Sequence, residues 1–299
     1  MKKILITGCG GMLGSAVYPY FKNQGYDVLA TDIDLNEKWL EFMDIRDMEE
    51  SEEKANNLDP DAIIHLAALT NLEYCEENLE EAYETNFIGT RNIAQICKRK
   101  DIPLVHVSTA GVFDGTKYSY TEGDIPNPIN VYGKTKFYGE IAVENILEKH
   151  FILRAGWMVG GGKKDKKFVS YICSQVKNGN KEFNVVNDKF GVPTYTKDFA
   201  LNMEKIMRTT YYGKYHMTGL GEASRYEIAK YIIEKLDVKG AKINSVSSDF
   251  FKKDFSVERA DSERMINTNL TKINLNLMRG WKEGLEEYLK DEYPFIGKD

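Results

Sequence analysis

Residues 3–14 read KILITGCGGMLG, a short apolar run followed by four glycines within seven residues. A run of this length, rich in Ile and Leu, predicts a buried strand. Glycines spaced as Gly8, Gly11 and Gly14 allow a tight turn, close approach of the backbone to a pyrophosphate, and packing of a helix on the strand. The positive end of the following helix then faces the phosphates. The stretch predicts a dinucleotide site formed by Gly8, Gly11, Met12, Leu13 and Gly14.

Four further apolar runs follow this stretch, at 27–31, 62–66, 104–108 and 151–154, each too short for a helix. Amphipathic stretches typical of helices lie between the strands, at 13–23, 79–99 and 131–149. This alternation predicts an α/β fold of the Rossmann type, a doubly wound parallel sheet covered on both faces. Because such sheets bind ligands beyond the carboxyl ends of their strands, we expect the functional side chains there.

The second half of the chain is less regular. We expect helices at 168–176, 196–207, 225–236 and 280–293 and a strand at 182–186, with Thr196 as the N-cap of one helix and a capping box of Ser224 and Glu227 opening another. There is no internal repeat or long linker. We therefore expect a dinucleotide-binding half of residues 1–158 and a smaller α/β substrate-binding lobe of residues 159–299, with segments around 183–216 returning to the first half.

Composition excludes several classes of function. The 299 residues carry a net charge of −6 without a basic stripe, which argues against a nucleic-acid binder. The four Cys form no CxxC pair and the four His fit no metal spacing, so we expect reduced thiols and no metal. No apolar run reaches the roughly 18 residues that a membrane span needs, and the N-terminus does not match a signal peptide. We expect a cytoplasmic protein without membrane or nucleic-acid partners.

Asp32 ends the second expected strand, 18 residues after Gly14. A carboxylate at this place accepts hydrogen bonds from both hydroxyls of an adenosine ribose and repels a 2′-phosphate. The residue therefore favours NAD(H), with NADP(H) as the alternative cofactor. Asp34 takes this role if the strand ends later, and a turn aspartate without a ligand is the simplest other interpretation.

Tyr132 and Lys136 are one of four Tyr-x-x-x-Lys pairs in the chain, and they follow a strand that ends at the hydroxyl of Thr109. Residues i and i+4 of a helix share a face, so phenol and ammonium can address one ligand. Reduction of a ketone by hydride needs a proton for the developing alkoxide, and nearby positive charge makes a phenol a better acid. We interpret Tyr132 as the acid, Lys136 as the charge, and Thr109 as the group that holds the carbonyl oxygen.

TGCGGMLG at 7–14, Asp32, STAGVF at 108–113 and YGKTK at 132–136 occur in this order. With them the chain resembles the extended short-chain dehydrogenases/reductases, and among these the dTDP-4-dehydrorhamnose reductase family. The likeness runs through most of the chain. It includes MDIRD (43–47), AAL (67–69), ETNFIGTRN (84–92), RAGW (154–157) and the stretch 168–200.

The resemblance implies reduction of a 4-keto-6-deoxy nucleotide sugar by NAD(P)H, with Thr109, Tyr132 and Lys136 as catalytic residues. It implies cofactor contacts from the residues of its other motifs, namely Asp44, Ile45, Ala67, Ala68, Leu69, Asn86, Ser108 and Trp157, beside Tyr132 and Lys136 themselves. Substrate contacts are expected from Thr70, Trp157, Phe168, Arg225 and Arg259. The two arginines are candidates for a bidentate grip on the substrate diphosphate, with ordinary surface arginines as the other interpretation.

The chain departs from the family pattern where Ala110 and Gly111 follow Thr109 in place of Asp-Tyr, and where Arg225 replaces a Trp. Two other functions stay open. One is an epimerase or dehydratase of a nucleotide sugar, ranked lower because Ala110 and Gly111 supply no acid–base pair. The other is a non-catalytic regulatory or binding subunit with this fold. The resemblance also suggests a homodimer through the expected helices 79–99 and 131–149.

Overall fold

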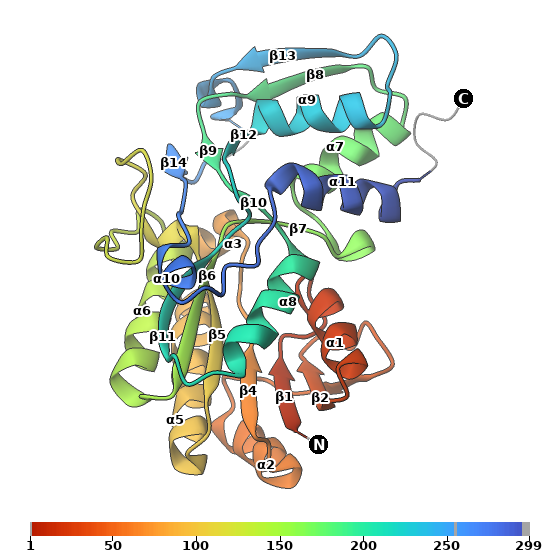
Figure 1. Ribbon diagram of the computed structural model, residues 1–299. Helices are drawn as coiled ribbons and strands as arrows, with labels where there is room; N and C mark the ends of the chain where they lie inside the picture. Colours follow the sequence, from red (N-terminus) through yellow and green to blue (C-terminus); the bar gives the residue numbers. More distant parts are fainter. Residues whose placement is uncertain (1, 254–255, 295–299) are drawn as a thin grey trace.

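The computed structural model describes residues 2–253 and 256–294. Its centre is a seven-stranded, wholly parallel sheet in the order β11-β6-β5-β4-β1-β2-β3, shown in the lower half of Figure 1. The strands are β1 (Lys3–Thr7), β2 (Asp27–Asp32), β3 (Leu40–Phe42), β4 (Ala62–His65), β5 (Leu104–Thr109), β6 (His150–Ala155) and β11 (Gly213–Met217). The strand order reverses between β1 and β4, which confirms the predicted doubly wound Rossmann fold.

Helices cover both faces of this sheet because successive strand residues point to opposite sides. Ile4 and Ile6 of β1 pack with the helices α1 (Gly14–Asn23) and α8 (Thr196–Met207). Leu5 points the other way, into a core shared with three helices. These are α2 (Met48–Leu58), α5 (Thr90–Lys100) and α6 (Val131–Ile146).

The prediction of one continuous helix at 79–99 is wrong. The chain instead forms α4 (Leu79–Tyr83), a π-helical turn (Glu84–Gly89) and α5, after a short α3 (Leu72–Glu77). The side chain of Ile45 packs where a Cβ on Gly89 would lie, 2.6 Å away, so the turn wraps around a buried neighbour. The helical register thus changes where a distant segment packs against the turn, and helical periodicity along the sequence does not reveal such a neighbour.

Three smaller expectations also fail. Thr196 is the first residue of α8, and the N-cap is Tyr195, which makes no side-chain capping bond. The helix expected to reach residue 149 ends at Ile146, because Leu147 is buried in an extended conformation. Sequence periodicity missed α2, in which only Ser51 and Ala55 are buried.

The upper half of Figure 1 is a smaller lobe built on three helices and a two-stranded parallel sheet. The helices α7 (Phe168–Lys177), α9 (Arg225–Lys235) and α11 (Trp281–Glu292) share an apolar core. The predicted strand becomes β8 (Glu182–Val186), paired with β13 (Lys242–Val246). The capping box of Ser224 and Glu227 at the start of α9 is confirmed.

Two small sheets lie between the seven-stranded sheet and the lobe (Figure 1). In one, β7 (Trp157–Val159) pairs with β10 (Pro193–Tyr195). In the other, β9 (Phe190–Gly191) lies between β12 (Ala223–Ser224) and β14 (Ser262–Glu263). From β10 the chain returns through α8 and β11 to the central sheet, and the short α10 (Thr268–Lys272) packs beside β11.

The four cysteines, Cys9, Cys75, Cys97 and Cys173, are buried and free. Over residues 2–253 and 256–294, no three His, Cys, Asp or Glu side chains are grouped so that they could hold a metal ion. No helix in these same ranges is long and apolar enough to cross a membrane.

Candidate active site

The glycine turn joins β1 to α1 and packs tightly against its surroundings. Gly8 has a φ of +67°, and a Cβ on it would lie 2.3 Å from the backbone of Ala67. A Cβ on Gly14 would lie 2.1 Å from the carbonyl oxygen of Cys9, whereas Gly11 has no neighbour closer than 3.5 Å. The turn therefore admits no side chain at its first and last glycine, as the pattern predicts.

The N-terminus of α1 has no side-chain cap. Leu13 holds the N-cap position, and neither its side chain nor that of Met12 can accept a hydrogen bond from the first N–H groups as a carboxylate would. The N–H groups of Ser15 and Ala16 donate to the carbonyls of Gly11 and Leu13, at 3.1 and 3.0 Å, and the start of the helix carries the positive end of its dipole. The turn thus fits the pyrophosphate of a dinucleotide.

Asp32 lies at the end of β2 with its carboxylate on the glycine turn. Its Oδ2 accepts the N–H of Gly10 at 2.8 Å, and its Oδ1 accepts the N–H of Asp34 at 3.0 Å. Asp34 itself is exposed and accepts a hydrogen bond from Asn36. The structure thus places the carboxylate of Asp32 on the turn, whereas Asp34 approaches Gly10 with its backbone carbonyl.

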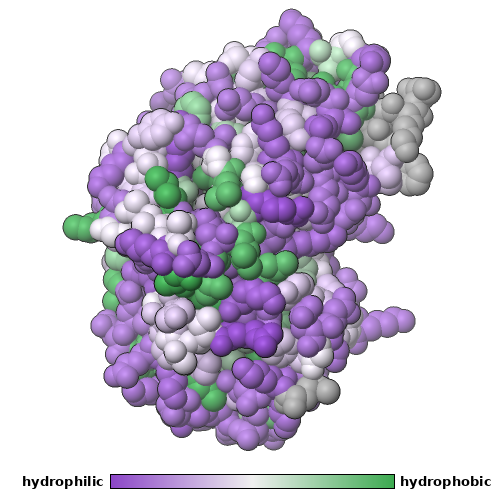
Figure 2. All heavy atoms as spheres, viewed as in Figure 1, coloured by the Kyte–Doolittle hydropathy of each residue, from purple (hydrophilic) through white to green (hydrophobic). Residues whose placement is uncertain are grey.

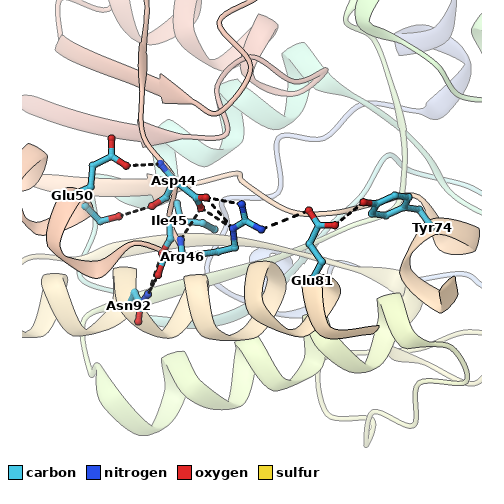
Figure 3. Close-up of polar contacts among 8 residues, drawn as sticks. Asp44, Ile45, Arg46, Glu50, Tyr74, Glu81 and Asn92 are labelled. Atoms are coloured by element: carbon cyan, nitrogen blue, oxygen red, sulfur yellow. Dashed lines mark hydrogen bonds and ion pairs between the residues drawn. The ribbon is translucent and has the colours of Figure 1, made fainter. Parts of the chain in front are cut away.

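The side chains of Asp44 and Ile45 are engaged with protein groups (Figure 3). The Asp44 carboxylate accepts bonds from Arg46, the shortest at 2.6 Å, and these bonds hold the pKa of Asp44 below its usual value. Arg46 reaches on to Glu81 at 3.6 Å. Ile45 is buried, and its carbonyl accepts a bond from Asn92. The pair therefore forms a rigid wall between β3 and α5.

Asn86 connects the loop after β4 to α6, the helix that carries Tyr132 and Lys136. Its amide exchanges two hydrogen bonds with the backbone of Leu69, at 2.8 and 2.9 Å, and donates a third to Thr135 at 3.1 Å. The side chain is fully buried. Asn86 therefore positions the loop of Ala67, Ala68 and Leu69 with respect to Lys136, the next residue of α6.

Tyr132 projects from the first turn of α6 toward Thr109 at the end of β5. Asn130 caps this helix by accepting the N–H of Gly133, which sets the direction of the first turn. Burial raises the pKa of Tyr132 to about 12, a hydrogen bond with Thr109 lowers it, and the carboxylate of Glu263 raises it. The phenol consequently holds its proton at neutral pH.

Lys136 lies one turn further along α6 and is buried. Its Nζ donates to the carbonyl of Val107 on β5 at 2.8 Å. Burial lowers the pKa of Lys136 to about 8, and the negative charge of Glu140 opposes this. The ammonium is thus held against the sheet and loses its proton more readily than an exposed lysine.

A buried ion pair that sequence reasoning missed lies further along α6 from Tyr132 and Lys136. Arg154 of β6 donates to both carboxylate oxygens of Glu140, at 2.8 and 2.7 Å. Burial alone would raise the pKa of Glu140, but the bonds and charge of Arg154 outweigh burial and the pKa falls. Ser108 is buried beside this carboxylate. The fixed negative charge supports the ammonium of Lys136, four residues away on the same helix.

Across the site stands a group that we call the lobe wall, made of Trp157, Phe168, Arg225 and Glu263. The guanidinium of Arg225 lies 3.7 Å from the centroid of the Trp157 ring and 5.1 Å from that of Phe168. Burial lowers its pKa to about 10, Glu263 raises it and Arg259 lowers it. Within the described part of the chain, no carboxylate forms an ion pair with Arg225.

Glu263 is the member of the lobe wall that sequence reasoning missed. Its carboxylate accepts the indole N–H of Trp157 at 2.5 Å, and its charge acts on both Tyr132 and Arg225. The sheet β12-β9-β14 positions this group, because Ser224 of β12 precedes Arg225 and Glu263 belongs to β14. No short motif marks the residue, since its partners come from distant segments.

The remaining expected substrate residues lie at the edge of the site. Arg259 pairs with Glu73 at 2.6 Å and donates to the carbonyl of Val257, so a carboxylate already balances its charge. Thr70 is exposed after the Ala67–Leu69 loop. Figure 2 shows apolar atoms gathered in the middle of this face, between the lobe above and the sheet half below.

The chain is similar to known proteins along almost its whole length. Residues 1–293 match the family model described as the RmlD substrate binding domain. The chain is 32% identical to the spore coat polysaccharide biosynthesis protein SpsK of Bacillus subtilis, over 97% of this chain and 98% of that protein. It is 31% identical to methionine adenosyltransferase 2 subunit beta of Xenopus laevis, over 83% of this chain and 76% of that protein.

A solved structure is similar along almost the whole chain. It is a dTDP-4-dehydrorhamnose reductase of Bacillus anthracis in complex with NADP, with a TM-score of 0.89 and 31% identity. The match covers 97% of this chain and 99% of that one. The fold is therefore shared with a reductase.

Proposed function

Because the chain belongs to the RmlD substrate binding domain family, we propose that it reduces the 4-keto group of a 6-deoxy nucleotide sugar with NAD(P)H. The observation that carries the proposal is the arrangement of Thr109, Tyr132 and Lys136. Hydroxyl, phenol and ammonium come from β5 and α6 to one place at the carboxyl edge of the sheet.

The residues of the nucleotide half fit a dinucleotide. Gly8, Gly11 and Gly14 would hold its pyrophosphate and Asp32 its adenosine ribose, with the nicotinamide toward Tyr132. When bound, the reduced nicotinamide supplies the hydride for the carbonyl carbon. A nicotinamide cofactor also agrees with the NADP in the similar reductase from Bacillus anthracis.

In the proposed reaction, the carbonyl oxygen accepts hydrogen bonds from Thr109 and Tyr132. As hydride reaches the carbon, Tyr132 gives its phenolic proton to the oxygen and becomes a phenolate. A phenol with a pKa of about 12 needs help to lose its proton, and the ammonium of Lys136 supplies it by stabilising the phenolate. Thr109 holds the oxygen in line throughout.

Arg225 is the residue proposed to hold the substrate's diphosphate. It occupies the first position of α9, where the helix dipole adds positive potential and disfavours a cation. An anionic ligand relieves both this repulsion and the unpaired charge, and the planar guanidinium can make two parallel bonds to a phosphate. Arg259, already paired with Glu73, is the weaker candidate.

The test is turnover by the wild-type protein and by Tyr132→Phe. With NADH or NADPH and a panel of 4-keto-6-deoxy nucleotide sugars, absorbance of the reduced cofactor should fall for one substrate. Tyr132→Phe should lower kcat by about 1000-fold, because the proton donor is lost. Tyr138→Phe, an exposed tyrosine of the same helix, serves as the matched control and should keep full activity.

Two outcomes count against the reductase. Product formed without net loss of reduced cofactor indicates an epimerase, and unchanged turnover by Tyr132→Phe removes the assigned acid.

A second candidate is a non-catalytic subunit, which the likeness to methionine adenosyltransferase 2 subunit beta favours. Under this proposal the protein binds a dinucleotide and a partner protein without turnover. The experiment above distinguishes the two functions. A non-catalytic subunit would bind NADH or NADPH but would consume neither with any keto sugar of the panel.

A further inference from the structure

A loop of the lobe lies directly on the glycine turn. Gly160, Gly161 and Gly162 all have positive φ, at 139°, 85° and 53°, and lead into a single 3₁₀ turn (Gly162–Lys164). A Cβ on Gly161 would lie 2.6 Å from Cγ and 3.0 Å from Cα of Met12. The glycines therefore let the lobe touch the residues just before α1, where the cofactor's pyrophosphate is proposed to bind.

Lys164 extends from this loop toward the connection between β2 and β3. Its Nζ lies 3.1 Å from the carboxylate of Glu37 and 5.6 Å from the ring centroid of Trp39, and its side chain is only 19% exposed. Trp39 in turn stacks on Tyr18 of α1, with centroids 3.9 Å apart. The ammonium is thus enclosed between the lobe, the glycine turn and the loop that follows β2.

The charge of Lys164 reaches the glycine turn itself. Burial and the Asp32 carboxylate raise the pKa of the Cys9 thiol to about 12, and the Lys164 ammonium opposes the rise. Cys9 follows the first glycine of the turn. A ligand bound at this turn would therefore interact electrostatically with both the Lys164 ammonium and the Asp32 carboxylate.

Acidic groups otherwise dominate this corner. Asp32 and Asp34 line the loop next to the turn, and Asn36 ties that loop to the carbonyl of Gly10 at 3.2 Å. Glu37 follows and pairs with Lys164. Lys38 and Lys163 are exposed and form no ion pair with residues of the described ranges. Lys164 is thus the enclosed cation available to offset the carboxylates.

We propose that Lys164 is a phosphate ligand for the dinucleotide, supplied by the lobe and released from Glu37 when the cofactor binds. The identity of the ligand as a dinucleotide rests on the proposed function. The pyrophosphate and a 2′-phosphate would present the same chemistry to an ammonium.

The experiment measures cofactor binding directly, without turnover. NADH and NADPH are titrated by calorimetry into wild-type protein, Lys164→Gln, Lys164→Arg and the matched control Lys163→Gln. We expect Lys164→Gln to bind NADPH about tenfold more weakly, Lys164→Arg to recover most of the affinity, and Lys163→Gln to stay within about twofold of wild type. Because an ion contact is screened, wild-type affinity should also fall more steeply with salt than that of Lys164→Gln.

Comparing the loss of affinity for NADH with that for NADPH shows which phosphate Lys164 binds. A loss confined to NADPH assigns the 2′-phosphate, and an equal loss for both assigns the pyrophosphate. The proposal is overturned if Lys164→Gln binds both as tightly as wild type, or if a loss comes without recovery by Lys164→Arg and without a change in salt dependence. A wild-type protein that binds neither dinucleotide overturns the proposed function as well, whereas binding that ignores Lys164 overturns this inference alone.

Discussion

The glycine turn and the lobe wall face the same site, but they are built in opposite ways. The turn is a contiguous stretch whose geometry follows from backbone sterics, since side chains on Gly8 or Gly14 would collide with main-chain atoms. The lobe wall combines segments near 157, 168, 225 and 263, which meet through side chains. The glycine turn can therefore be recognised from sequence, whereas the lobe wall is assembled from side chains that a small sheet brings together.

The largest effect is expected at Gly14, because its clash is with backbone. Gly14→Ala places a Cβ 2.1 Å from the carbonyl oxygen of Cys9, whereas Gly11→Ala meets nothing closer than 3.5 Å. We expect Gly14→Ala to lower the free energy of unfolding by about 3 kcal/mol and Gly11→Ala by less than about 1 kcal/mol. Urea denaturation followed by circular dichroism measures both. Equal losses would show that the turn is not limited by local backbone sterics.

An intermediate effect is expected for substitution of Arg225, and it should change the binding of the substrate and not that of the cofactor. Arg225→Gln removes the unpaired charge of the lobe wall, and we expect KM for the nucleotide sugar to rise about 30-fold with kcat nearly unchanged. The control is Arg208→Gln, which changes a surface arginine that caps the C-terminus of α8 and pairs with Glu204 of that helix. Steady-state kinetics at saturating cofactor separate the two constants. A fall in kcat at constant KM would instead place Arg225 in the chemical step.

The smallest effect is expected in the pH dependence of kcat/KM, which should follow the titration of Lys136 between the glycine turn and the lobe wall. The pKa of Lys136 is lowered to about 8, so its ammonium is present below pH 8 and lost above it. We expect kcat/KM for ketone reduction to be level up to about pH 7.5 and roughly tenfold lower at pH 9. Tyr132, with a pKa of about 12, contributes no decline in this range.

Lys136→Arg tests the assignment of this limb. An arginine stays charged throughout, so the decline between pH 7.5 and 9 should disappear in whatever activity the variant retains. A decline that persists unchanged would assign the limb to another group.

The sequence predicted the five inner strands and the Tyr132/Lys136 helix because each is a local apolar pattern of adequate length. It did not predict α2, whose outward face is polar and whose buried residues are small. Nor did it predict the π-helical turn, whose Gly89 packs tightly against the side chain of Ile45. Local periodicity in the sequence indicates which face of a helix or strand is buried. It does not indicate which side chains from distant segments pack against that face.

The same division applies to the site. Glycine spacing, the aspartate that ends β2 and the Tyr-x-x-x-Lys pair are short-range patterns, so the sequence by itself determined where the candidate nucleotide site and the candidate catalytic pair lie. Only the tertiary structure decided that Arg225 has no carboxylate partner while Arg259 does, that Glu263 faces Tyr132, and that Lys164 reaches Glu37. The physical reason is that charge and burial depend on neighbours in space, and for these residues the neighbours are far away along the chain.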